Sequence, residues 1–279
     1  MNTERGLRMT PRQDTGPVAC SRMYNVAPAA RAAWDAMFDW LSETTGHRLN
    51  IIGYEAPAPL DGLWARPDLG AAFMCGYPYQ QRPRDARPIV LAAPVSTETW
   101  SEGGPYYASQ IVMRDSAEDG ADLAKARWAW TVRDSQSGYN APREFLAARD
   151  SLARVATVGP LVTPFAVVEA LRSGRADAGG VDAYAWQLLK LHAPDQIAGL
   201  KTVATTARAP FPMLVAAQAL DRAVAADLAK ALLRSHQLPE AAALLADLGL
   251  ARFAEPDFDA VEALAKRAEQ TDLQLGGPW

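Results

Sequence analysis

Cysteine and histidine are scarce in this chain of 279 residues, which has two cysteines and three histidines. Cys20 and Cys75 cannot build a disulfide framework, although a single bridge between them stays open. His47, His192 and His236 are far apart in the sequence and do not cluster with the cysteines. A Cys/His zinc site is therefore not expected, and we predict no metal.

Long apolar runs and an excess of positive charge are also missing. No run approaches the ~18 apolar residues of a membrane span, so direct membrane insertion is not expected. The net charge is −4 and no basic stripe is visible, which argues against a nucleic-acid partner. An anionic ligand remains compatible with this charge, because local dipoles govern a buried site.

The first seventeen residues, 1–17, are polar, and we expect a disordered leader. They contain no apolar segment of the kind found in secretory signals. The sequence as it stands therefore predicts a cytoplasmic protein.

After residue 17, strand and helix patterns alternate. Continuous apolar runs predict strands at 18–24, 49–54, 71–75 and 88–95, because strands covered by helices on both faces have this pattern. Between the first two, apolar residues recur with the helical period over 28–45. These segments together predict a first layered unit of βα type.

A second block follows, with strands expected at 106–113, 128–132, 154–158, 176–181 and 200–205 and helices at 119–126, 134–149, 163–173 and 182–192. The strand at 200–205 is expected to return to lobe one. The remaining chain is expected to be mostly helical, at 218–235, 239–248 and 257–270.

This order predicts an α/β fold of two βα lobes joined by a hinge with two crossovers. Lobe one would comprise 18–104 plus 206–279, including a helical C-terminal tail on that lobe, and lobe two would comprise 105–205. The crossovers fall near 95–106 and 200–208. Two crossovers make a natural hinge around a cleft.

The strongest site candidate is the segment 134–140, which follows a strand and starts a helix. Ligands of open α/β sheets bind beyond the carboxyl ends of strands, beside helix N-termini. The hydroxyls of Ser135 and Ser137, the Gln136 amide and free backbone N–H groups would converge there on an oxyanion. Gly138 lets the backbone come close. The alternative is that one serine merely caps the helix.

The same segment resembles a nucleophile elbow, Gly-x-Ser-x-Gly, with Asp134 in place of the first glycine. A hydrolase would also need a positioned base. None of the three histidines lies at the carboxyl end of a predicted strand. We therefore expect no catalytic residue and no enzyme.

Three further residues lie where strands end. Tyr24 follows the first strand, and Tyr77 follows the third in a Gly-Tyr-Pro-Tyr turn. Both could stack on a ligand and donate an O–H bond, or they are half-buried packing residues. Asp182 ends a strand and begins a helix, so it is either an N-cap or a ligand acceptor.

The eight tryptophans raise one more alternative, an aromatic cage for a quaternary ammonium ligand. Only Trp64 and Trp100 fall in expected loops that could face a cleft. The cage therefore stays a minor alternative to an anion site.

Four segments in order, 22–25, 72–78, 134–140 and 174–182, resemble the phosphonate-binding (PhnD-like) family of ABC-transporter substrate-binding proteins. The resemblance covers roughly 18–215. It implies the type 2 periplasmic-binding fold, in which two α/β lobes close on a solute.

The resemblance also implies roles for residues. A Ser-Thr-Ser-Gly-like turn that holds phosphonate oxygens corresponds to residues 135–138, and its Gln136 replaces a hydroxyl by an amide. A Gly-x-Pro-Tyr-like turn corresponds to residues 76–79, and the family's aspartate corresponds to Asp182. Because Gln136 has an amide where the family has a hydroxyl, the resemblance does not imply strict specificity for phosphonates.

We accordingly expect a solute-binding protein for an ABC transporter, which captures a small anionic ligand of phosphonate or phosphate type between its lobes. It would be a monomer without a cofactor, with a transporter permease as partner, and periplasmic if it follows the family. The alternatives are an enzyme on the same fold or a cytoplasmic sensor or carrier. The leader is too short to supply the DNA-binding helices of a transcription regulator.

Overall fold

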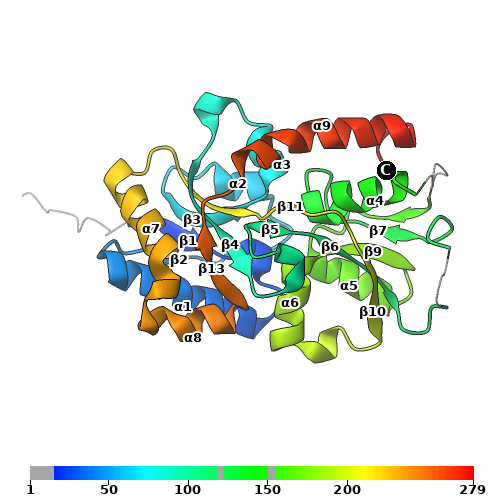
Figure 1. Cartoon of the computed structure of the whole chain (residues 1–279), viewed down its shortest axis with the longest axis horizontal. Coiled ribbons are helices and arrows are strands. Elements are labelled where there is room, and N and C mark those ends of the chain that lie inside the picture. The colour runs from blue at the N-terminus through cyan, green and yellow to red at the C-terminus, as the bar shows by residue number, and fades with distance from the viewer. Residues whose placement is uncertain (1–15, 119–121, 150–154) are drawn as a thin grey trace, which may run out of the picture.

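The computed structural model describes residues 16–118, 122–149 and 155–279. Two sheets lie side by side, each covered by helices (Figure 1). The strand orders are β13-β4-β12-β3-β1-β2 and β10-β6-β9-β7-β8. The predicted α/β fold with two lobes is confirmed. Most of the predicted disordered leader lies outside the described residues.

The first sheet is built mainly from the strands predicted for lobe one. Its strands are β1 (Val18–Cys20), β2 (Asn50–Ile51), β3 (Leu69–Met74), β4 (Ile89–Ser96), β12 (Met213–Ala216) and β13 (Leu250–Ala254). Strand β1 pairs in parallel with β2 and β3, whereas β12 runs antiparallel between β3 and β4. Every residue of β3 is buried, which explains its continuous apolar sequence.

Strands β12 and β13 correct the prediction of a mostly helical C-terminal part. A short apolar run such as Met213–Ala216 has no periodicity that separates a strand from a helix. Both strands complete the first sheet, where β13 pairs antiparallel with β4.

The helices on this side are α1 (Pro28–Thr45), α2 (Leu60–Trp64), α3 (Gly76–Gln80), α7 (Arg222–Arg234), α8 (Pro239–Asp247) and α9 (Phe258–Leu275). Helices α1, α7, α8 and α9 lie close to the predicted positions. Helices α2 and α3 were not predicted, since Trp64 was expected in a loop and residues 76–79 in a turn. Helix α1 starts at a proline that fits the first turn and stops at Gly46, which takes φ 72°. It buries Trp34, Phe38 and Leu41 against the core.

The second sheet contains β6 (Ser109–Arg114), β7 (Trp128–Ala129), β8 (Thr157–Val158), β9 (Ala178–Asp182) and β10 (Leu200–Thr205). Its helices are α4 (Ala141–Ala147), α5 (Pro164–Arg172) and α6 (Ala183–His192), and a π-helical turn, η4, covers Gln136–Asn140. Five short 3-10 helices cover Arg22–Tyr24, Arg84–Ala86, Thr99–Ser101, Pro194–Gln196 and Ser235–Gln237.

Two local predictions for this lobe are wrong. Strand β10 does not return to the first lobe, since it pairs antiparallel with β6 at the edge of the second sheet. A helix was predicted at 119–126, but residues 122–126 form turns, and 119–121 lie outside the described residues.

The two lobes are joined at more places than the two crossovers. The chain leaves the first sheet after β4 and returns after β10, and β5 (Tyr106–Tyr107) pairs antiparallel with β11 (Ala209–Pro210) between them. Helix α9 packs on α3 of lobe one and continues over α4 of lobe two, where Arg267 binds Glu144 at 2.7 Å (Figure 1). The C-terminal tail was predicted to lie on lobe one. The structure corrects this, since α9 contacts both lobes.

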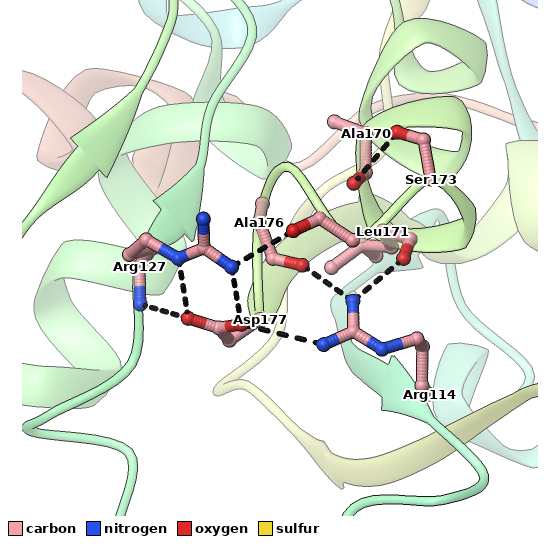
Figure 2. Close-up of polar contacts among 8 residues, drawn as sticks. Arg114, Arg127, Ala170, Leu171, Ser173, Ala176 and Asp177 are labelled. Atoms are coloured by element: carbon pink, nitrogen blue, oxygen red, sulfur yellow. Dashed lines mark hydrogen bonds and ion pairs between the residues drawn. The ribbon is translucent and has the colours of Figure 1, made fainter.

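A partly exposed ion-pair network fixes the chain at the start of β9 (Figure 2). Asp177 accepts from the Nε and Nη2 of Arg127, both at 2.8 Å, and from Arg114 Nη2 at 3.3 Å. Arg114 also donates to the carbonyls of Leu171 and Ala176 at 2.8 Å. The hydrogen bonds from Arg127 hold the pKa of Asp177 well below its usual range.

We expect Asp177→Asn to lower the free energy of unfolding by about 1–2 kcal/mol at pH 7, after allowance for the partial exposure of the site. A carboxyl with a lowered folded-state pKa stabilises above its unfolded pKa. The difference between wild type and variant should therefore begin to shrink as the pH falls below roughly 4, and it should vanish only below the lowered folded-state pKa. Urea unfolding at several pH values checks this. Asp68→Asn, which removes only a local pair with Arg66, is the control. Equal losses would contradict the account.

Candidate functional site

A cavity of about 570 Å³ lies between the two lobes. Residues that follow β1 and β3 border it from one side, and residues that follow β7 and β9 border it from the other. It therefore lies beyond the carboxyl ends of parallel strands, where α/β sheets hold ligands. The polar groups on its wall belong to Arg22, Asn25, Arg31, Glu55, Thr131, Asp134, Ser135, Ser137, Thr163, Asp182 and Gln196.

Several helices begin at this cavity. Residues at the first turns of α1 and α5, together with Asp182 before α6 and Ser135 before η4, border it. Helix α1 follows Ala27, whose methyl side chain cannot cap the backbone N–H groups. The N-terminal ends of helices carry partial positive charge, so their convergence favours a bound anion.

The η4 turn shows that capping and ligand binding are compatible. The Ser135 hydroxyl accepts from Gly138 N–H at 2.9 Å, so it caps the turn and keeps its own proton to donate. Ser137 instead donates to Asp182 Oδ2 at 3.0 Å. Its carbonyl accepts from Ser109 Oγ at 2.7 Å, which fixes the turn on the second sheet.

Two glycines allow the turn to lie close to its neighbours. A Cβ on Gly138 would lie 2.1 Å from Thr131 Oγ1, and one on Gly180 would lie 2.1 Å from Pro142 Cγ. The latter Cβ would also meet the Ser137 carbonyl at 3.1 Å. Because neither contact leaves space for a side chain, both glycines set the position of the two serines.

Asp182 is 3% exposed and satisfied as an N-cap. Its Oδ1 accepts from the N–H groups of Tyr184 and Ala185 at 2.9 and 3.1 Å. Burial raises its pKa to about 6, although these donors and Ser137 oppose the rise. The same burial raises the pKa of the surrounding phenols and thiol, namely those of Tyr24, Tyr107, Tyr184 and Cys75.

Of the six residues predicted as ligand contacts, Ser135, Ser137 and Asp182 border the cavity. Tyr24, Tyr77 and Gln136 do not line it. The structure thus brings together the turn before α4 and the end of β9, and it leaves the aromatic part of the prediction outside the wall.

Tyr24 lies in an aromatic cluster between the lobes. Its ring is 1% exposed and stands 4.7 Å from the ring centroids of both Phe73 and Tyr184. Its hydroxyl is buried without a hydrogen-bond partner among the described residues, yet it lies near enough to Asp182 to lower that carboxyl's pKa. Tyr24 is therefore a packing residue, and it is fully buried rather than half-buried as the alternative had it.

Gln136 and Tyr77 belong to two turns that meet. Gln136 is 2% exposed, and its backbone lies beside the Cys75 thiol of the opposite lobe. Tyr77 is half-buried, and its pKa is raised by burial and by nearby Asp272 of α9. The Gly-Tyr-Pro-Tyr turn therefore borders the cavity through Cys75 and Pro78 rather than through its tyrosines.

The sequence analysis missed Arg22, Arg31 and Thr131, all of which border the cavity. Arg22 stood inside a segment that carried the family resemblance, and that was the available signal. The predicted strand 18–24 included Arg22, whereas β1 ends at Cys20. Thr131 is 3% exposed and its Oγ1 has no partner among the described residues.

Expectations about cysteine pairing, metal sites and membrane spans also followed from the sequence. Cys20 and Cys75 are both buried and free, so the single bridge left open is not formed. Among the described residues, no group of three metal-binding side chains is found. In the same part of the chain, no helix has the length and apolarity needed to span a bilayer.

Comparison with known proteins gives a family and a set of related folds. The family model described as "ABC transporter, phosphonate, periplasmic substrate-binding protein" matches residues 25–261. The comparison with curated proteins gave no match.

Three solved structures illustrate the fold. PhnD1 from Prochlorococcus marinus, in complex with methylphosphonate, has a TM-score of 0.73 and 14% identity, with 93% of this chain and 99% of that chain covered. A binding protein component of an ABC phosphonate transporter from Pseudomonas aeruginosa has a TM-score of 0.71 and 18% identity, with 92% and 88% covered. A Xanthomonas citri protein bound to chloride ion has a TM-score of 0.63 and 15% identity, with 91% and 98% covered.

Proposed function

We propose a function from the premise that this chain belongs to the family of periplasmic substrate-binding proteins of ABC phosphonate transporters, whose model it matches over residues 25–261. The chain captures a small organic anion of phosphonate or phosphate type in the cavity between its lobes. The observation that carries this proposal is the Ser135 hydroxyl, which borders the cavity among converging helix N-termini and accepts from Gly138 N–H, so that its own proton can be donated to a ligand. Oxyanions bind at such positions in many folds.

We place the anion against the η4 turn, with Ser135, Ser137 and Asp182 as contacts from lobe two. Lobe one consists of 18–104 plus 206–279 in this proposal, and lobe two of 105–205. Since residues of both lobes border the cavity, a ligand that touches both favours the closed arrangement by its differential affinity. The protein acts as a monomer and delivers its ligand to the transporter permease.

Lobe closure is testable in solution. We expect saturating methylphosphonate to reduce the radius of gyration in small-angle scattering and to raise the melting temperature, with about 2.7 kcal/mol of added stability at a hundredfold excess over the Kd. Choline, a quaternary ammonium of the aromatic-cage alternative, should do neither. Unchanged scattering at a concentration that saturates binding would contradict closure.

Asp182 should make anion binding depend on pH. Because its folded-state pKa is raised to about 6, the carboxyl is neutral below pH 6 and repels an anion above it. We expect affinity for methylphosphonate to fall several-fold between pH 5 and pH 7.5, beyond the part that the ligand's own titration explains. Asp182→Asn removes the contribution of the protein to this pH dependence, and calorimetry at the same pH values measures the difference. Identical pH profiles for wild type and variant would show that Asp182 does not face the anion.

We propose further that the chain does no chemistry on its ligand. Asp182 is held by two backbone N–H groups and by Ser137, so both of its oxygens are engaged. In the part of the chain that the structure describes, no histidine borders the cavity. Phosphorus NMR of methylphosphonate after long incubation with the protein should show the compound unchanged.

A further inference from the structure

Arg22 is a buried cation on the lobe-one wall of the cavity. It begins the short 3-10 helix directly after β1, and it is 8% exposed. Within the described residues, its guanidinium donates one hydrogen bond, from Nη2 to the Ala58 carbonyl at 3.2 Å. Nε is buried without a partner, and Arg22 forms no ion pair with any residue that the structure describes.

Such a cation needs a counter-charge. Guanidinium groups remain charged in proteins, and burial of a charge without a partner is strongly unfavourable. Burial also lowers the pKa of Arg22, because removal from water disfavours the charged form of the guanidinium. Glu55 attracts it from a distance, but that carboxylate is 65% exposed and pairs with Arg31 at 3.0 Å. The counter-charge is therefore to be sought in the cavity itself.

The phosphonate group of the proposed function is placed on the opposite wall of this cavity. The η4 turn that would hold it belongs to lobe two, whereas Arg22 belongs to lobe one. A volume of about 570 Å³ lies in the range of about 300–1,000 Å³ that encloses drug-sized ligands, and it exceeds what a one-carbon phosphonate fills.

The cavity wall between the η4 turn and Arg22 is largely apolar. The apolar side chains on it come from both lobes, namely Met23, Val26, Leu60, Trp64, Val132, Val162 and Phe165. The Trp64 Nε1 already donates to the Phe73 carbonyl at 2.8 Å, so this indole contributes hydrocarbon surface. The wall fits a carbon segment and gives it no hydrogen-bonding role.

We propose that Arg22 forms a second anion subsite, so that the ligand class is a phosphonate whose carbon chain carries a second acidic group. This inference rests on the proposed function. The phosphonate binds at Ser135 and Ser137, the chain lies along the apolar wall, and a carboxylate or second phosphonate pairs with Arg22. A ligand of this kind contacts both lobes with charged groups. The distance between its two acidic groups therefore determines how well it stabilises the closed arrangement of the lobes.

Calorimetry with three phosphonates of matched length tests the subsite: pentylphosphonate, 4-phosphonobutanoate and 4-aminobutylphosphonate. We expect 4-phosphonobutanoate to bind about 10–100-fold more tightly than pentylphosphonate, as one charge-assisted hydrogen-bonded pair predicts. Arg22→Met should remove this preference and leave the affinity for pentylphosphonate within a few-fold. Arg31→Met, which removes a cavity-wall arginine that already has a carboxylate partner, should keep the preference.

The ranking in the wild-type protein decides the inference even if Arg22→Met does not fold. Equal affinity for pentylphosphonate and 4-phosphonobutanoate, or preference for the amine, which Asp134 and Asp182 would favour, overturns the second subsite and leaves the phosphonate site intact. Failure of all three compounds and of methylphosphonate to bind would instead overturn the proposed function. An unchanged preference in folded Arg22→Met would overturn the assignment to Arg22.

Discussion

Gly138→Ala should abolish measurable phosphonate binding while the protein still folds. The added Cβ would lie 2.1 Å from Thr131 Oγ1 and 2.9 Å from Thr131 Cβ, and Thr131 is buried. Relief requires the η4 turn to move, because a β-carbon cannot rotate away. The move displaces Ser135, whose hydroxyl accepts from Gly138 N–H, together with Ser137. Calorimetry with methylphosphonate measures the loss, and circular dichroism verifies folding.

A second glycine supplies the matched control. A Cβ on Gly53 would meet only Arg31 Nη2 at 3.6 Å, an ordinary contact, so Gly53→Ala should bind as wild type does. Thr131→Gly removes the atoms that the new Cβ meets, and in combination with Gly138→Ala it should restore part of the affinity. Wild-type affinity in Gly138→Ala would mean that the η4 turn does not hold the ligand.

The double variant Ser135→Ala/Ser137→Ala should lower affinity for methylphosphonate by about 10–100-fold, since the Ser135 hydroxyl supplies a charge-assisted hydrogen bond of ~1.5–3 kcal/mol. The two single variants should affect binding in different ways. Ser135 has a free proton, so its loss acts on the ligand directly. Ser137 donates to Asp182, so its loss also raises the pKa of that carboxyl and shifts the pH dependence of binding upward.

Loss of a helix cap has to be separated from loss of a ligand contact. Asp221 caps α7 through the N–H groups of Ala223 and Val224, and it does not border the cavity. Asp221→Ala should cost about 1 kcal/mol of stability and leave affinity unchanged. Affinity equal to wild type in the double serine variant, with stability lowered as in Asp221→Ala, would show that the serines act only as caps.

Local sequence patterns predicted most of the framework because they report burial directly. Helix α1 was predicted from Pro28 to Thr45 and has those bounds, since its cap signals and its apolar period agree. The strands β12 and β13 were missed for the opposite reason. Their short apolar runs lie among helices, and only pairing with the distant strands β3 and β4 makes them strands.

The site shows the same division between local and distant causes. Ser135 and Asp182 could be nominated because strand ends and helix starts are visible in sequence. Tyr24 also follows a strand, but its ring packs against Phe73 and Tyr184, which are far away along the chain. Arg22 was passed over because an arginine is usually exposed, and its burial without a carboxylate partner appears only once the lobes are assembled.

A crystal structure of the protein with methylphosphonate tests the central claim most directly. The account predicts density for one phosphonate between the lobes, with its oxygens accepting from the Ser135 hydroxyl and from backbone N–H groups of the η4 turn. A phosphonate bound elsewhere, or a cavity without ligand at a concentration that saturates binding in solution, would contradict it.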